Sequence, residues 1–243
     1  MASTSEIGHA KNVANFQDLI EFVTAYGATY NPSKNSLKLP QLIALKASAD
    51  ATLADVITKN TNYNNKVNER ITAFSGLKSL STRLVNALQT TDATTETIGN
   101  AKTFNRKMQG KKASSSQTPT DPNTPAPNTI STSQQSYDQL IQHLAGLTSI
   151  LEAETSYTPN ETDLQVATLQ TKIADLTAKN TAVATAYASI SNSRIARNET
   201  LYTSTTSLVE TALEVKKYVK SVFGATSPQY AQVKGIEFSK PRL

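Results

Sequence analysis

The sequence predicts an all-α protein, an elongated helical bundle with long, coiled-coil-like helices in two pseudo-symmetric repeats joined by a disordered linker. Three observations predict this fold. The same short phrase begins at Tyr30 and again at Tyr157. Apolar residues behind each phrase recur at helical spacing. No stretch has the pattern that predicts a strand, apart from a tail that could be extended but cannot form a sheet alone.

The repeated phrase is "YNPSKNSL" in the first half and "YTPNETDL" in the second, with Tyr, Pro and Leu in common. Residues 30–74 align with residues 157–201 without a gap, which indicates an ancient internal duplication. The identical pairs are Tyr30/Tyr157, Pro32/Pro159, Leu37/Leu164, Leu42/Leu169, Ala47/Ala174, Ala51/Ala178, Val56/Val183, Asn65/Asn192 and Arg70/Arg197.

In the first half, we expect helices over residues 14–26, over a long stretch that ends at Ser75-Gly76, and over 76–89 and 93–109. Glycine is a frequent residue just beyond a helix, which places the end of the last one at Gly110.

The start of the long helix in the first half has two interpretations. Asn31-Pro32 offers an N-cap and a proline, but Pro40 would then stand in the third turn, where proline kinks a helix. Alternatively Ser36 is the cap and residues 30–35 form a turn. For the helix over 93–109, we expect Asp92 to be the cap.

In the second half, helices are predicted over residues 136–154, 160–202 and 206–224, with Gly224 as a C-cap. Thr158 to Glu161 has the pattern of a capping box with proline at the first helical position. Ser227-Pro228 is expected to open a short last helix.

Both long helices are expected to pack through heptad positions. The second helix has them at Leu169, Ile173, Leu176, Asn180, Val183, Tyr187 and Ile190. The first matches more loosely, at Leu42, Leu45, Ala49, Leu53, Val56, Tyr63, Val67, Ile71 and Phe74.

Residues 111–136 are rich in Ser, Thr and Pro and poor in apolar side chains, which is typical of a disordered linker. The linker divides the chain into a first helical repeat over 1–110 and a second over 137–243. We expect the two repeats to pack together as one bundle.

The segments "ALEVKKYVKSVFGATSPQY" (212–230), "ARNETLY" (196–202) and "YNPSKNSL" are similar to those of a group of uncharacterised bacterial helical proteins with the same two-part plan. This resemblance covers nearly the whole chain. It implies a helical fold and a bacterial origin, and it implies neither an activity nor any site residue.

The formal net charge of +5 is concentrated in two segments, 100–112 and 213–243. Localised positive charge can attract an anionic partner, although lysine-rich helix ends are more often simply solvated. The candidate residues for binding an anion or a partner are Lys102, Arg106, Lys107, Lys111, Lys216, Lys217 and Lys220. Phe104, Tyr218 and Phe223 lie close to them in sequence but fit apolar helix faces.

The sequence carries no catalytic constellation that we can identify. It has no cysteine, which excludes disulfides and thiolate chemistry. Its two histidines are His9, expected in a frayed terminus, and His143, expected in a structural or exposed position. His143 has no acidic residue three or four positions away, and the facing Glu-x-x-His pairs that a helical metal site needs are absent from the sequence. No enzyme activity, metal or other cofactor is therefore predicted.

No run of 18 apolar residues is present, so no transmembrane helix is expected. The first residues lack a basic region followed by an apolar one, which predicts no secretory signal and a cytoplasmic location.

These features favour a non-enzymatic structural or protein-interaction scaffold, whose partner is another protein or a second copy of the chain. One alternative is a nucleic-acid-binding protein that uses the basic helix ends. A second is a membrane-active, pore-forming-like protein, for which the apolar segments of the chain are too short or too polar.

Overall fold

The computed structural model describes residues 4–110 and 135–240, and it confirms the predicted all-α fold. Within these residues the secondary structure is helical and contains no strand. The chain forms two compact units. Unit 1 contains the described residues up to Tyr63 and those from Ala186 onward, and unit 2 contains those from Asn64 to Thr185.

Each unit takes its helices from both halves of the sequence. The first long helix, α2 (Leu39–Phe74), begins in unit 1 and ends in unit 2. The second, α6 (Val166–Asn198), begins in unit 2 and ends in unit 1. The compact units therefore cut across the sequence repeats 1–110 and 137–243, and each unit has its own hydrophobic core.

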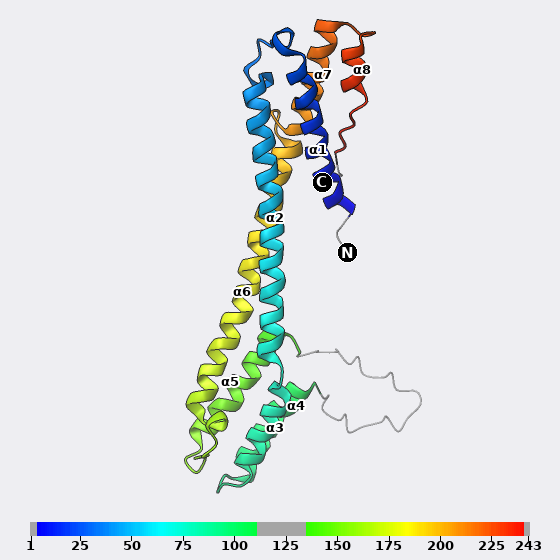
Figure 1. The fold of residues 1–243 in the computed structure, drawn as a ribbon. Helices are drawn as coiled ribbons and strands as arrows, with labels where there is room; N and C mark the ends of the chain where they lie inside the picture. Colours follow the sequence, from blue (N-terminus) through cyan, green and yellow to red (C-terminus); the bar gives the residue numbers. More distant parts are fainter. Residues whose placement is uncertain (1–3, 111–134, 241–243) are drawn as a thin grey trace, which may run out of the picture. The chain divides into compact units, whose positions relative to one another are not determined.

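In unit 1, α1 and α7 pack together beside the first part of α2, and α8 lies against both α1 and α7 (Figure 1). Phe16, Leu19, Leu42, Leu201 and Val215 are among the side chains buried in its core. Besides the two long helices, its elements are α1 (Thr4–Ala25), the 3-10 turns Gly27–Thr29 and Asn35–Leu37, a π-helical turn (Glu199–Thr203), α7 (Leu208–Phe223) and α8 (Pro228–Lys234).

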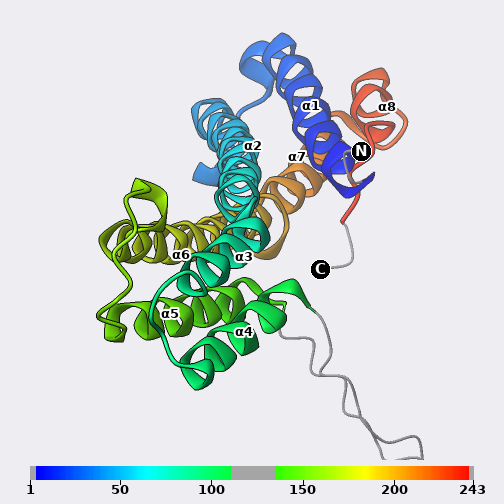
Figure 2. The same cartoon turned by 90° about the horizontal axis from the view of Figure 1, so that it is seen from below.

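In unit 2, α3 and α5 both pack against α4, and the first part of α6 contributes to the same core (Figure 2). Leu84, Leu88, Leu144, Leu147 and Leu169 are buried there. Besides the long helices, its elements are α3 (Leu77–Leu88), α4 (Thr95–Gln109), α5 (Tyr137–Ala153) and the 3-10 turn Thr162–Leu164.

The repeated sequence phrase forms the same local structure in both units. Tyr30 donates its hydroxyl to the carbonyl oxygen of Leu37 at 2.7 Å, and Tyr157 donates to that of Leu164 at 3.0 Å. Each leucine ends a 3-10 turn, and a long helix begins two residues later. Because both tyrosines are buried, each hydroxyl satisfies a carbonyl that would otherwise lose its contact with water.

The long helices begin later than the sequence predicts. The expected capping box at Thr158–Glu161 is wrong, because these residues precede the 3-10 turn and α6 starts at Val166. In the first half α2 starts at Leu39, so Pro40 falls in the first turn, where its missing N–H has no partner to lose. The predicted choice of Ser36 as the cap is also wrong, since Ser36 lies within the 3-10 turn.

Several predicted helix ends are confirmed. Gly110 ends α4 with a left-handed backbone (φ 73°), Gly224 follows α7, and Ser227 caps α8 by accepting from the Tyr230 amide. The predicted cap Asp92 is wrong, because Thr94 accepts the hydrogen bond from the Thr97 amide at the start of α4.

The end of the predicted linker is structured. Ser136 caps α5, and the Gln135 side chain donates to the carbonyl of Lys107 at 2.6 Å. The other residues of the predicted linker, 111–134, lie outside the described residues.

The predicted heptad face is buried only in part. Leu169, Leu176 and Val183 are buried, but Tyr187 and Ile71 are more than half exposed. In unit 1 the heptad position Ile190 is buried as predicted, but Ala186 is buried in place of Tyr187, and Ser193 and Arg197 are buried further along α6. Ser193 donates to Asp55 of α2 at 2.7 Å, so a small polar residue faces α2 at this point.

Candidate interaction surfaces

The basic residues predicted on α4 belong to unit 2. Lys102 and Arg106 are exposed, and Arg106 donates to the Thr103 hydroxyl at 2.9 Å. Lys107 is half-buried, with its ammonium group 5.5 Å from the centre of the Phe104 ring. Lys111, the fourth member of this group, lies outside the described residues.

The basic residues predicted on α7 belong to unit 1 and have different environments. Lys217 is exposed, and Lys220 lies over the Tyr230 ring at 5.7 Å. Lys216 instead points at the end of α8 and the residues just after it, where it donates to the carbonyls of Lys234, at 3.4 Å, and of Ile236. Burial lowers the pKa of Lys216, which fits an internal structural role.

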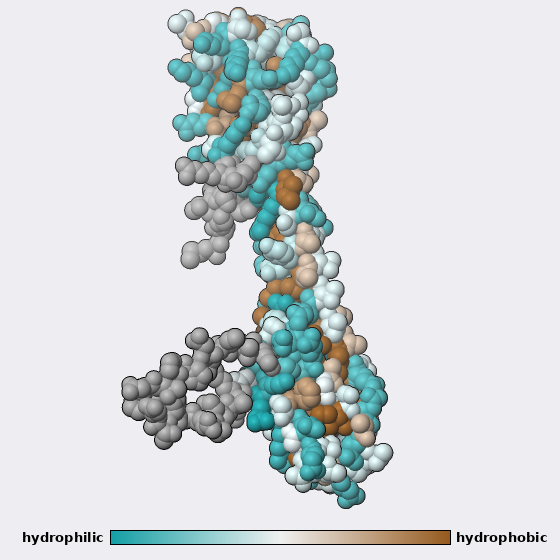
Figure 3. Space-filling model, turned by 180° about the vertical axis from the view of Figure 1, so that it is seen from behind, coloured by the Kyte–Doolittle hydropathy of each residue, from teal (hydrophilic) through white to brown (hydrophobic). Residues whose placement is uncertain are grey.

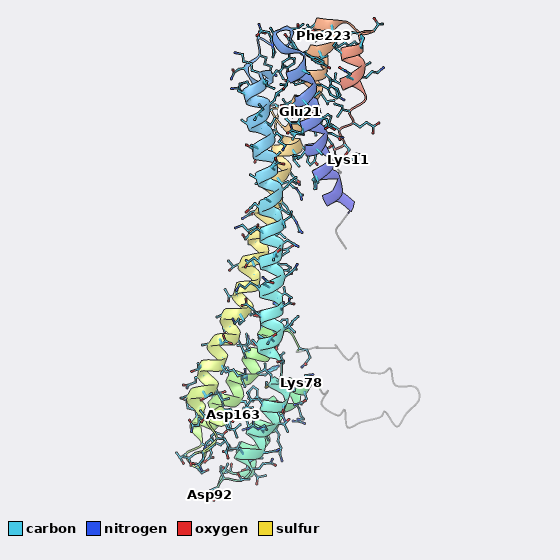
Figure 4. The ribbon with its side chains drawn as sticks, viewed as in Figure 1. Lys11, Glu21, Lys78, Asp92, Asp163 and Phe223 are labelled. Atoms are coloured by element: carbon cyan, nitrogen blue, oxygen red, sulfur yellow. The ribbon has the colours of Figure 1, made fainter. Side chains whose placement is uncertain are left out.

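The two basic groups therefore lie in different compact units. Acidic residues also lie along α7, where Glu214 pairs with Lys34 and Glu210 pairs with Lys240. The neighbouring aromatic residues Phe104, Tyr218 and Phe223 pack against the two cores, as their spacing predicts. Figure 4 labels Phe223 at the end of α7.

A buried polar network in unit 1 was not predicted. His9, expected in a frayed terminus, is buried inside α1, and its Nδ1 lies 2.6 Å from the Tyr202 hydroxyl. Asn12, one turn further along α1, donates to the same hydroxyl at 3.2 Å. Tyr202 stands in the π-helical turn, a distortion that often occurs at functional sites. The only signal in the sequence is the helical spacing of His9, Asn12 and Phe16, which extends the apolar face of residues 14–26 backward.

His143 is buried in α5 of unit 2, which makes it a structural histidine. Its ring centre lies 6.3 Å from that of Phe104, and no hydrogen bond to its Nε2 is present among the described residues. Burial lowers the pKa of its imidazole, and the nearby Lys107 lowers it further. Across the described residues, no three His, Asp or Glu side chains come together as a metal site would require.

We expect acidification to destabilise the protein through His143. In the unfolded chain its pKa is near 6.5, and in the folded chain it is lower, so the unfolded state binds more protons below about pH 6.5. The contribution of His143 to stability is therefore fully present above that pH and declines as the pH falls, by at most about 1.4 kcal/mol per pH unit. Urea unfolding between about pH 7.5 and pH 5 should show a smaller loss for His143→Leu than for the unsubstituted chain. Equal losses would contradict the prediction.

Large apolar side chains are exposed on the long helices in unit 1. On α6, Tyr187 and Ile195 are 60% and 62% exposed and stand eight residues apart, with the half-buried Ser191 midway between them. This spacing places all three on one side of the helix. We call it the α6 face. Ala188 beside it is also exposed, and the ring of Tyr187 lies 5.9 Å from that of Tyr63 on α2.

Exposed apolar residues also occur on α2. Ile43 and Ile57 are 53% and 68% exposed, and the alanines between them at positions 47 and 54 are exposed too. Figure 3 shows apolar side chains at the surface among hydrophilic ones on the face that it views. Among the described residues, no helix is long and apolar enough to cross a membrane.

Two open hollows lie on the described part of unit 1. One, of about 420 Å³, is lined by Val13, Leu53 and the Lys46–Asp50 ion pair, whose charged atoms lie 2.8 Å apart. Another, of about 340 Å³, lies beside the end of the chain and is lined by Lys11, which Figure 4 labels on α1, and by Asn15 and Glu237.

Comparison with known proteins identifies no relative: no protein-family model, no curated protein and no solved structure matches the chain. The class of the protein is defined by its fold alone: within the described residues it is an all-α helical bundle of two compact units. The resemblance to a bacterial helical group stays a prediction.

Proposed function

We propose that this chain is a non-enzymatic protein-interaction module, and that its α6 face binds the same face of a second copy. The observation that carries this proposal is the exposure of Tyr187 and Ile195 on one side of a long helix. Large apolar side chains that line one side of an exposed helix favour burial against another helix.

The residues around these two side chains suit a helix as the partner. Ser191 and Ala188 are small, so a second helix can approach closely between Tyr187 and Ile195. The charged residue nearest to these four is Arg194, seven residues after Tyr187; it is exposed, so its guanidinium group can stay in solvent while the four are buried. A face that contacts its own copy closes a two-fold dimer, which is the commonest symmetry of homo-oligomers.

The contact is confined to one helix face, so we expect a weak and reversible dimer. Sedimentation velocity over a wide range of protein concentration should show a monomer that converts to a dimer. Ile195→Lys should remove the dimer, because dimerisation would bury two unpaired lysine charges.

Ala196→Lys is the matched control. It adds the same charge to the next residue of α6, which is also exposed but points away from the α6 face. This variant should dimerise as the unsubstituted chain does. A chain that stays monomeric at every concentration, or that dimerises equally well with Ile195→Lys, would contradict the proposal.

The same protein samples separate the two alternative functions. Tight binding of a single-stranded oligonucleotide that weakens steeply with salt, and that is lost in Lys102→Glu, would favour nucleic-acid binding instead. Release of dye from liposomes would favour a membrane-active protein.

A further inference from the structure

The described end of the chain is an extended segment held against unit 1 by side chains. We call residues Ile236–Lys240 the tail; it follows α8 directly after Gly235. Asn15 of α1 donates to the Glu237 carbonyl at 2.6 Å. Asn12 of α1 donates to the Ser239 carbonyl at 2.7 Å and accepts from the Ser239 amide at 3.0 Å. Lys216 of α7 donates to the Ile236 carbonyl.

The tail also presents its side chains in alternation. Ile236 and Phe238 are partly buried against the core of unit 1, whereas Glu237 and Ser239 are exposed. The Lys216 ammonium lies 5.3 Å from the centre of the Phe238 ring. Main-chain hydrogen bonds combined with pockets for alternate side chains are the means by which proteins bind extended peptides.

The groups that hold the tail are positioned in advance. Asn12 is only 2% exposed, and the second N–H of its amide donates to Tyr202, whose hydroxyl also contacts His9. This network fixes the Asn12 carboxamide with one N–H and its oxygen directed at the tail. A receptor group that is already ordered loses little entropy when it binds.

We propose that α1 and α7 form a binding site for an extended peptide with apolar residues at alternate positions, which the tail of a second copy occupies by exchange. In this structure the chain's own tail occupies it. Beyond Ile236, the tail's main-chain hydrogen bonds in this structure are made to side chains, so it can leave without opening a helix. An incoming tail brings Lys240 to the same partner, Glu210. The site is separate from the α6 face and does not depend on it.

The first test uses a fluorescent peptide, Gly-Ile-Glu-Phe-Ser-Lys, which matches residues 235–240. Fluorescence anisotropy should show that it binds Phe238→Ser at least about tenfold more tightly than the unsubstituted chain, because the weakened tail competes less. Adding Asn12→Leu to Phe238→Ser should reduce this binding by about tenfold or more, since two main-chain contacts are lost. A peptide with serine in place of both apolar residues is the matched control and should not bind.

Ser239→Pro gives a second way to loosen the tail without removing a core side chain. It deletes the amide that donates to Asn12, and Ser239 itself is exposed. Circular dichroism will show that each variant is folded. Equal peptide binding by the unsubstituted chain and by Ser239→Pro would overturn the proposal, as would a lack of binding to both loosened variants.

The second test asks whether a whole chain supplies the occupant. The Asn12→Leu chain has an intact tail and a damaged site, and the Phe238→Ser chain has the reverse. Because the chain has no cysteine, Ala231→Cys in the first, an exposed position of α8 outside the tail, and Lys11→Cys in the second each allow one specific fluorescent label. Energy transfer should appear when the two chains are mixed, and it should be lost when Asn12→Leu is added to the second chain. Peptide binding without energy transfer would overturn the second copy as the occupant.

Discussion

Replacing Leu42 with alanine is expected to lower the free energy of unfolding by about 2–5 kcal/mol, and replacing its repeat equivalent Leu169 is expected to do the same. Both side chains are fully buried, Leu42 in the core of unit 1 and Leu169 in that of unit 2. Each substitution removes apolar contacts and leaves a cavity that its neighbours fill only partly. Urea unfolding followed by circular dichroism measures both effects.

Ile43→Ala is the matched control for the first substitution. It truncates a side chain of the same size at the next residue, where more than half of the side chain is exposed, and should cost no more than about 0.5 kcal/mol. Hydrogen exchange will locate the changes, with protection reduced in unit 1 for Leu42→Ala and in unit 2 for Leu169→Ala. A similar cost for Ile43→Ala and Leu42→Ala would contradict the described burial of α2.

Replacing Gly146 with alanine is expected to destabilise the protein by about 1–3 kcal/mol. A Cβ atom at this position of α5 would lie 2.4 Å from Cε1 and 2.5 Å from Cζ of Phe104 on α4. Carbon atoms do not approach so closely, so the Phe104 ring must move out of its place between the two helices. Alanine favours a helix by about 1 kcal/mol relative to glycine, so the clash must exceed this gain.

Gly99→Ala is the control, because Gly99 lies within α4 and a Cβ atom there would meet nothing within 4 Å. It should stabilise the protein by about 0.5–1 kcal/mol. Phe104→Leu removes the atoms that cause the clash, so Gly146→Ala should cost much less in that background. An unchanged cost there would show that the destabilisation has another cause.

Most of the helices could be predicted from the sequence, because the signals that define them are local. Apolar spacing located the helices, and Gly110, Gly224 and Ser227 correctly marked where they end or begin. The errors at Thr158 and Asp92 arose because several residues in a row could serve as a cap. Only the surrounding structure selects one of them, through the turn that precedes the helix.

The arrangement of the helices could not be predicted in the same way. The repeat at Tyr30 and Tyr157 shows that two segments are equivalent, but it does not show which helices pack around each. The candidate sites could not be predicted from the sequence for the same reason. Asn12 meets Ser239, and His9 meets Tyr202, across most of the length of the chain, and no spacing rule connects residues so far apart.

Unit 1 is built from two segments far apart in the sequence, and this has a consequence for biosynthesis. Unit 2 is a single continuous stretch, Asn64 to Thr185, so the ribosome delivers all of it before any residue from Ala186 onward. In unit 1, α1 packs against α7 and α8, which are synthesised much later. The apolar surface of α1 that these helices cover is therefore exposed until translation has passed Lys234. The apolar side chains of α1 and of the first part of α2 are therefore made long before the segments that complete their core.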